Sequence, residues 1–201
     1  MTTTTENQLE SQLKDEILRM YQDVADHPDG EFHFYHGRAA AERFGYAAEW
    51  LDGAPPAAVA SFAGVGNPHL GAAITDGETV LDVGSGAGLD SIVAARAAGP
   101  GGRIIGVDLN DTMCRKARAH AAQAGVEMDC HVGQMERLPV PDGSVDVVIS
   151  NGVINLSFHK RRVIEELFRV LTPGGRLSIT DIVSAKQLSQ SVVNDPKLWA
   201  S

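Results

Sequence analysis

Three alternating glycines follow a short, mostly apolar segment near the middle of the chain. The segment Thr79 to Val83 is rich in β-branched residues, and Gly84, Gly86 and Gly88 come directly after it. Glycine has no Cβ, so the backbone can turn tightly here and a ligand can approach it closely. A strand that leads through such a turn into a helix is typical of nucleotide and nucleoside sites. The alternative is a glycine turn that only packs the helix against the strand.

The residues after this turn argue against a phosphate ligand. Dinucleotide-binding turns need a further glycine at the position where this chain has Leu89. Asp90 follows in the first turn of the predicted helix. The N-terminus of a helix favours a phosphate, but the negative charge of a carboxylate at this position repels one. Together, Leu89 and Asp90 favour a nucleoside that carries no phosphate.

Asp108 ends the next β-branched segment and is the strongest single candidate for binding such a ligand. A carboxylate at this point can accept hydrogen bonds from both hydroxyl groups of a ribose held over the glycine turn. An alternative role would be to cap the next helix. That role suits Asn110 or Asp111 better, because they directly precede Thr112.

Two later segments offer further polar contacts. The Gln134 side chain can accept a hydrogen bond from an adenine amino group, and Met135 can cover the ring. The alternative is a polar turn without a ligand. Asn151 ends another apolar segment and is predicted to contact the cofactor or the reacting group, or else only to stabilise its own turn.

These residues need a framework that brings strand ends together. From Thr79 onward, short β-branched segments alternate with helical ones. The expected strands are Thr79 to Val83, Arg103 to Asp108, Met128 to Val132, Val145 to Ser150 and Arg176 to Ile182, and the expected helices are Leu89 to Ala98, Thr112 to Ala124 and Lys160 to Leu171. This alternation predicts an α/β fold with a Rossmann-like, doubly wound, mainly parallel sheet. Ligands of such sheets bind outside the carboxyl ends of the strands.

The first part of the chain has a different character. Apolar residues at spacings of three and four predict an amphipathic helix from about Gln8 to Ala25. Short helical pieces and many Gly and Pro residues follow. We therefore expect residues 1–70 to form a helical N-terminal extension and cap, and residues 71–201 to form the ligand-binding domain. Aromatic residues of the cap either suit a small, partly apolar substrate or form the cap's own core: Phe32, Phe34, Tyr35, Phe44, Tyr46 and Phe62.

Composition excludes several classes of partner. The net charge is −9 and Lys and Arg are not clustered, which argues against nucleic acid. No apolar run is long enough to cross a membrane, and the N-terminus lacks the features of a signal peptide, so a cytoplasmic protein is expected. Cys114 and Cys130 show no metal-ligand spacing and are expected to be reduced packing residues.

The histidines offer a base but no metal site. His36 is the predicted general base, with His69 and His159 as rivals, since imidazole titrates near neutral pH. His33 and His36 could pair on a metal, but no third ligand is evident, so no metal is expected.

Four segments carry a resemblance to a known family: VLDVGSGAGLDSIVAA, IIGVD, GQMERLPVPDGSVDVVISNGVINLS and RVLTPGGRLSITDIV. They resemble class I S-adenosylmethionine (SAM) dependent methyltransferases, in particular the arsenite methyltransferase-like branch. The resemblance covers roughly Ala63 to Ala200 and implies SAM as the cofactor. The predicted cofactor contacts are Gly84, Ser85, Gly86, Gly88, Asp108, Leu109, Gln134, Met135, Glu136 and Asn151, with Tyr35 as a lid residue and His36 and Asn151 as catalytic candidates.

Two departures bear on the substrate. The family's arsenic-binding cysteines correspond to Val65 and Gly152 in this chain. Trivalent arsenic is a soft ion that requires thiolates. The resemblance therefore implies SAM-dependent methylation of a small molecule other than arsenite. The alternatives are a SAM-binding or interaction module without activity, and an arsenite methyltransferase-like enzyme with an altered site.

A third departure is length. The family's sheet continues past the fifth strand, whereas the C-terminal strands are missing from this sequence. An uncovered fifth strand would expose an edge that another segment or subunit must cover. We therefore expect a homodimer or a masked edge.

Overall fold

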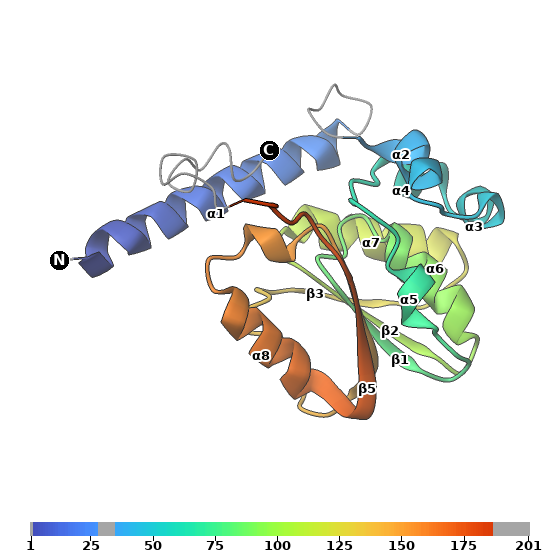
Figure 1. Cartoon of the computed structure of the whole chain (residues 1–201). Helices are drawn as coiled ribbons and strands as arrows, with labels where there is room; N and C mark the ends of the chain where they lie inside the picture. The colour runs from blue at the N-terminus through green and yellow to red at the C-terminus, as the bar shows by residue number, and fades with distance from the viewer. Residues whose placement is uncertain (1, 28–34, 187–201) are drawn as a thin grey trace.

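The computed structural model describes residues 2–27 and 35–186, and a single parallel sheet organises them (Figure 1). The strand order is β3-β2-β1-β4-β5, and every neighbouring pair runs parallel. The strands are β1 (Thr79–Val83), β2 (Arg103–Asp108), β3 (Asp129–Val132), β4 (Val145–Asn151) and β5 (Leu171–Thr180). The predicted α/β, Rossmann-like fold is confirmed.

Alternate side chains of the strands build a separate core on each face of the sheet. Leu81 and Val83 pack with Val163 and Leu167 of α8 (Lys160–Val170). Val80 faces the other way and packs with Ala94 of α6 (Leu89–Ala98), the face that also carries α7 (Asp111–Gln123). Because both faces are covered, four of the five residues of β1 are buried, as expected for a central parallel strand.

Most element boundaries lie within two residues of the sequence prediction, and two differ by more. Helix α1 (Thr2–Asp26) begins at Thr2 rather than near Gln8. Strand β5 begins at Leu171 rather than at the predicted Arg176, so it includes Pro173, Gly174 and Gly175. Leu171 pairs with Val145, and the next pair joins Arg176 to Val147, so the intervening residues form an irregularity in the strand.

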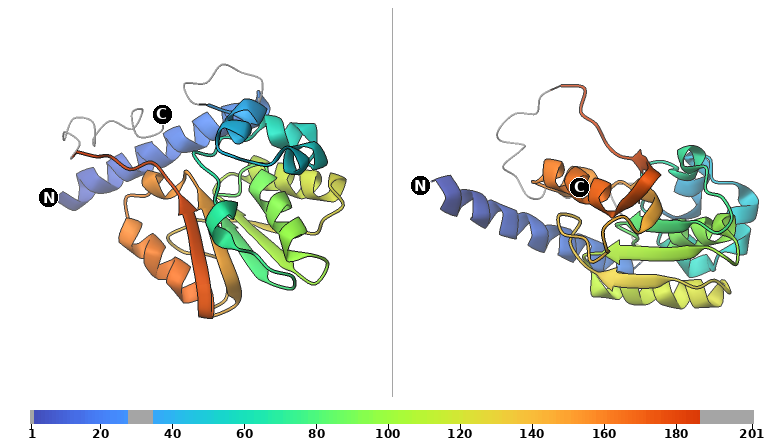
Figure 2. Two further views of the ribbon diagram at one scale, coloured as in Figure 1. Left: turned by 45° about the vertical axis from the view of Figure 1, so that its right-hand side comes forward. Right: turned by 90° about the horizontal axis from the view of Figure 1, so that it is seen from below.

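Within the described residues, the cap has four short helices, α2 (Gly37–Arg43), α3 (Ala48–Gly53), α4 (Pro56–Ala60) and α5 (His69–Ala72). Tyr46, Leu51 and Phe62 of the cap are buried together with Leu89 and Ile92 of α6. Helix α1 passes the carboxyl ends of the strands (Figures 1 and 2) and buries Val24 against α7 and the glycine turn.

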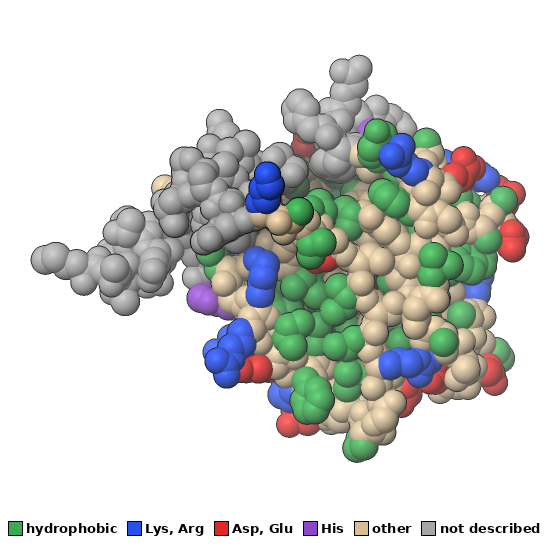
Figure 3. Space-filling view, viewed as in Figure 1, with side chains coloured by type: hydrophobic (Ala, Val, Ile, Leu, Met, Phe, Trp, Pro, Cys, Tyr) green, Lys and Arg blue, Asp and Glu red, His purple; other side chains and the backbone are tan. Residues whose placement is uncertain are grey.

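The outer side of the sheet at β5 is less well covered. Phe168 on α8 is 78% exposed, and Leu177 and Ile179 on β5 are 39% and 37% exposed. Figure 3 shows hydrophobic side chains gathered over α8 and β5. In the part of the chain that the structure describes, no helix is long and apolar enough to cross a membrane.

Candidate cofactor-binding site

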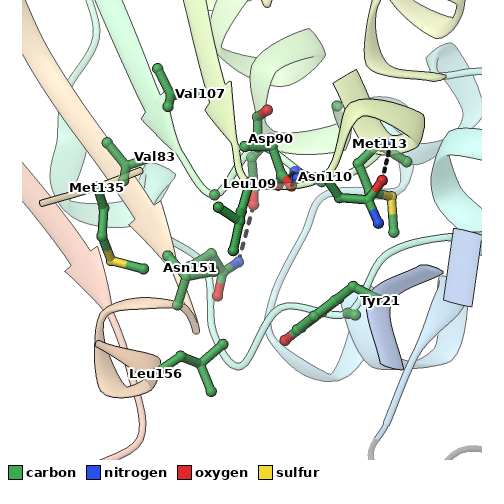
Figure 4. Close-up of a pocket in the computed structure, with 18 of the residues that line it drawn as sticks. Tyr21, Val83, Asp90, Val107, Leu109, Asn110, Met113, Met135, Asn151 and Leu156 are labelled. Carbon is green, nitrogen blue, oxygen red and sulfur yellow. Dashed lines mark hydrogen bonds between the residues drawn. The ribbon is translucent and has the colours of Figure 1, made fainter. Parts of the chain in front are cut away.

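A cavity opens at the carboxyl ends of β1, β2 and β4 (Figure 4). Its walls come from the glycine turn, the loops after β2, β3 and β4, the cap and helix α1. The structure brings together ten of the residues predicted to contact the cofactor: Gly84, Ser85, Gly86, Gly88, Asp108, Leu109, Gln134, Met135, Glu136 and Asn151.

The glycine turn is held in a backbone conformation that other residues rarely adopt. Gly84, Gly86 and Gly88 have φ values of 75°, 50° and 92°. A Cβ at Gly84 would lie 2.5 Å from Val153, so a larger residue would displace the loop after β4. A Cβ at Gly86 would meet nothing within 4 Å, which leaves open space for a ligand beside the backbone.

Asp108 is positioned by backbone amides. Its Oδ2 accepts a hydrogen bond from the Gly86 N–H at 2.9 Å, and its Oδ1 accepts one from the Asn110 N–H at 2.8 Å. Burial raises the pKa of Asp108, and the backbone N–H groups partly oppose this shift. Asn110 caps α7 through the N–H groups of Thr112 and Met113, so Asp108 does not serve as the cap. A carboxylate oxygen can accept more than one hydrogen bond, so the cavity side of Asp108 is suited to hydroxyl donors.

The turn after β3 forms another wall. Gln134, Met135 and Glu136 all line the cavity. The Ser157 hydroxyl donates a 2.5 Å hydrogen bond to Glu136 Oε1, which ties this turn to the loop after β4. A polar turn and a methionine on one side of the cavity fit the edge and face of a purine ring.

Asn151 lines the cavity and also ties together three distant parts of the fold. Its side-chain carbonyl accepts hydrogen bonds from the N–H groups of Val65 and Gly66 and from the Thr180 hydroxyl. Its amide donates to the Gly66 carbonyl and to the Asp90 carboxylate. These bonds fit a positioning role, and direct contact with the cofactor stays a prediction.

The cap residues predicted to act at the site are not brought into the cavity. Tyr35 is 64% exposed and lies under the guanidinium of Arg43, 4.7 Å from its ring centroid. Tyr35 and His36 are not among the described residues that line the cavity, so their roles stay predictions. Phe32, His33 and Phe34 lie outside the described residues.

The rival bases have different environments. His159 is exposed at the start of α8. The side chain of His69 is buried, and its Nε2 lies 3.0 Å from Asp90 Oδ1. The described residues include no group of three or more His, Cys, Asp or Glu side chains that could hold a metal ion.

Helix α1 contributes a wall that the sequence prediction missed. Ile17, Leu18 and Tyr21 line the cavity, and the Tyr21 hydroxyl points into it on the side of Asn151 and Leu156 (Figure 4). Burial, Asp108 and Asp181 raise the pKa of Tyr21 to about 12, so its phenol stays protonated near neutral pH. The amphipathic pattern indicated that one face of this helix packs against another part of the protein, but it did not identify the residues on which the helix packs.

The positions that correspond to the family's arsenic-binding cysteines face each other. A Cβ built at Gly152 would lie 3.2 Å from the Val65 Cγ1. Val65 and Gly152 are therefore adjacent. Val65 places methyl groups and Gly152 only backbone atoms at the positions that correspond to the family's thiols. Cys114 and Cys130 are buried elsewhere, in contact with each other, and Cys130 lies 3.6 Å from the Ser85 hydroxyl.

A parallel sheet with a glycine turn after β1 and a carboxylate after β2 defines a Rossmann-like protein that binds a nucleoside. The sequence matches the family described as "Methyltransferase domain" over residues 74–201. The chain belongs to this family of SAM-dependent methyltransferases, whose cofactor is SAM.

The curated relatives include enzymes with different acceptors. The chain is 46% identical over 159 residues to an arsenite methyltransferase of Halobacterium salinarum, a match that covers 79% of this chain and 40% of the relative. It is 36% identical over 109 residues to the ubiquinone/menaquinone biosynthesis C-methyltransferase of Bordetella avium, covering 54% of this chain and 42% of the relative. The chain thus spans less than half the length of these relatives.

A solved structure supports the same assignment. An arsenic(III) S-adenosylmethionine methyltransferase from Chlamydomonas reinhardtii superposes with a TM-score of 0.62 at 37% sequence identity. The match covers 80% of this chain and 53% of that chain.

Proposed function

We propose that this chain transfers the methyl group of SAM to a small organic acceptor, and that arsenite is not the acceptor. The adjacent pair of Val65 and Gly152 is the observation that carries this proposal. Trivalent arsenic needs soft thiolate ligands, and this pair supplies none. Phe62, Val153 and Leu156 add apolar surface to the cavity, which favours an acceptor with an apolar or aromatic part.

The cofactor contacts follow from the placement of the polar groups. We infer that Asp108 binds the ribose hydroxyls and that Gln134, Met135 and Glu136 surround the adenine. Gly84, Ser85, Gly86 and Gly88 then lie under the nucleoside, and Leu109 lies beside it. In this arrangement residues 71–201 bind the cofactor, and residues 1–70 close the cavity over it.

When bound, SAM supplies a methyl group that is already activated by its sulfonium. The protein then needs mainly to hold the acceptor in line with the methyl group and to exclude water. The apolar side chains of Ile17, Leu18 and Phe62 suit both tasks. An acceptor that must lose a proton also needs a base, for which His36 stays the predicted residue.

A transfer assay with radiolabelled SAM tests this proposal. The chain is incubated with a panel of phenols, amines, thiols and carboxylates, and with arsenite. We expect label in at least one organic product and none in arsenite. Label in arsenite would overturn the proposed acceptor class. Tight SAM binding with no transfer to any member of the panel would favour a SAM-binding module without activity.

We further infer that a second copy of the chain covers the outer edge of β5. Within the described residues β5 pairs only with β4, and apolar side chains are exposed beside it. An open edge of this kind readily pairs with another strand. The net charge of −9 supports the absence of a nucleic acid partner. We also infer that the protein is cytoplasmic.

A further inference from the structure

Another histidine, His120 on α7, contacts the glycine turn after β1. It is 6% exposed, and its Nδ1 lies 2.8 Å from the carbonyl oxygen of Ala87. A carbonyl oxygen can only accept a hydrogen bond, so Nδ1 carries the hydrogen and donates it. Ala87 lines the cavity, whereas His120 is not among the described residues that do. His120 can therefore influence a bound ligand only through the turn.

The side of α7 that carries His120 also packs against the turn at two other points. Met113 is buried together with Ala87. A Cβ built at Gly88 would lie 3.0 Å from the Ala117 Cα, so α7 and the turn are in close contact there. Met113, Ala117 and His120 are four and three residues apart, which places them on one side of the helix. Helix α7 therefore supports the glycine turn along this side.

The turn needs this support because glycine gives its backbone unusual freedom. Glycine can adopt many conformations, of which ligand binding requires one. Within the turn, the Gly88 N–H donates to the Ser85 carbonyl at 2.9 Å. The Ala87 carbonyl belongs to the same planar peptide group as this N–H, so the bond from His120 fixes the other side of the plane. Because Ala87 is buried, solvent does not readily replace His120 as the donor.

We propose that His120 is a positioning residue for the cofactor, which holds the glycine turn in the conformation that binds the nucleoside. This inference rests on the placement of the adenosine against the turn given under "Proposed function". A turn that is already held loses less conformational entropy when the cofactor binds. Without the donor on Nδ1, the buried Ala87 carbonyl loses its partner and the peptide can rotate out of the binding conformation. Cofactor affinity then falls while the sheet stays folded.

Two substitutions of matched shape separate the hydrogen bond from the packing of the ring. The amide nitrogen of Asn stands as far along the side chain as the Nδ1 of His, so His120→Asn keeps a donor. His120→Leu has the branched shape of Asn and offers no donor. The ligand is S-adenosylhomocysteine (SAH), the demethylated cofactor, and its binding to the full chain is measured by calorimetry. We expect His120→Leu to bind SAH about tenfold more weakly than the wild type, and His120→Asn to stay within about threefold.

A stability control separates this effect from a general loss of folding. Val170→Ala shortens a fully buried side chain at the C-terminal end of α8, away from the cavity. It should lower the urea concentration at the midpoint of unfolding and leave SAH affinity within about twofold. All titrations use a temperature at which circular dichroism shows each variant to be folded. If His120→Leu does not fold, His120→Phe repeats the test, because it keeps an aromatic ring and has no donor.

Equal SAH affinities for the variants with and without a donor would overturn the proposal, because the hydrogen bond would then make no difference. An equal loss of affinity in Val170→Ala would also overturn it, since affinity would then follow stability alone. Asp108→Ala distinguishes these outcomes from failure of the adenosine placement. If Asp108→Ala weakens SAH binding, the placement holds and only the role of His120 is wrong. If it does not, the placement fails and the proposal fails with it.

Discussion

The cofactor cavity and the outer face at β5 are built in opposite ways. At the cavity, the carboxylates of Asp90 and Asp108 are held by donors that come from the chain itself. At the outer face, Phe168, Leu177 and Ile179 remain exposed to solvent. Groups within the described residues therefore suffice to form the cavity, whereas the outer face still lacks a cover. Changes at the cavity should affect folding and cofactor binding, and changes at the outer face should affect association.

The largest effect is expected for Asn151→Ala. This change leaves the N–H groups of Val65 and Gly66 without their acceptor and removes a donor from Asp90. A buried polar group that loses its hydrogen-bond partner costs about 1 to 3 kcal/mol. We therefore expect the free energy of unfolding to fall by about 3 kcal/mol. Urea denaturation followed by circular dichroism measures this change.

Asn155→Ala is the matched control for this prediction. The Asn155 Oδ1 is buried and has no hydrogen-bond partner among the described residues, so its removal forfeits no such bond. We expect a change within about 0.5 kcal/mol. Equal destabilisation by the two variants would contradict the role assigned to the Asn151 bonds.

The next largest effect is expected for Asp108→Ala on cofactor affinity. Loss of two charge-assisted hydrogen bonds to the ribose should weaken SAM binding by about 1 to 3 kcal/mol. Asp111→Ala serves as the control, because Asp111 is an exposed carboxylate that pairs with Arg115 on the surface of α7. Calorimetric titration with SAM measures the affinity of both variants for the cofactor. An affinity for SAM that is unchanged in Asp108→Ala would contradict the ribose contact.

The ribose end of the cavity could be predicted from the sequence because it is built locally. The turn from Gly84 to Gly88 follows its strand directly, and Asp108 ends the neighbouring strand, so strand periodicity alone places them at one edge. The bonds that fix Asp108 come from backbone amides, which every sequence with this turn provides. A short-range pattern is therefore enough to identify this part of the site.

The other end of the cavity could not be predicted because it depends on contacts between distant segments. Asp90 is held by residues 46, 69 and 151, and no local pattern relates these positions. Tyr21 reaches the cavity only because α1 docks across the sheet edge. The sequence indicated an amphipathic helix without its docking surface, and for Asp90 it indicated only repulsion of a phosphate.

At the outer face, Phe168→Glu should weaken association of the proposed dimer. A charge placed in the apolar surface beside β5 opposes its burial, and we expect the dissociation constant to rise by at least about tenfold. Val132→Glu is the control, because Val132 is 51% exposed on β3 at the opposite edge of the sheet. Analytical ultracentrifugation measures both variants. A monomeric wild type at high concentration would rule out the dimer.

The smallest effect is expected for the ion pair that joins β5 to the residue directly before β1. Arg176 Nη1 and Nη2 donate to the two carboxylate oxygens of Glu78, each at 2.7 Å, and lower the pKa of Glu78 to about 2. Because the folded-state pKa lies below the ordinary value of 4.5, the pair stabilises the fold above that pH. The stabilisation is lost as the pH falls toward about 2.

Glu78→Gln should therefore destabilise the protein by about 1 kcal/mol at neutral pH, a modest figure because both side chains remain partly in water. The difference from the wild type should shrink below pH 4.5 and vanish near pH 2. Glu165→Gln removes an exposed pair with Arg161 and should change stability by less than about 0.5 kcal/mol. Urea denaturation across this pH range tests the pair. A pH-independent difference for Glu78→Gln would mean that the ion pair with Arg176 does not secure β5.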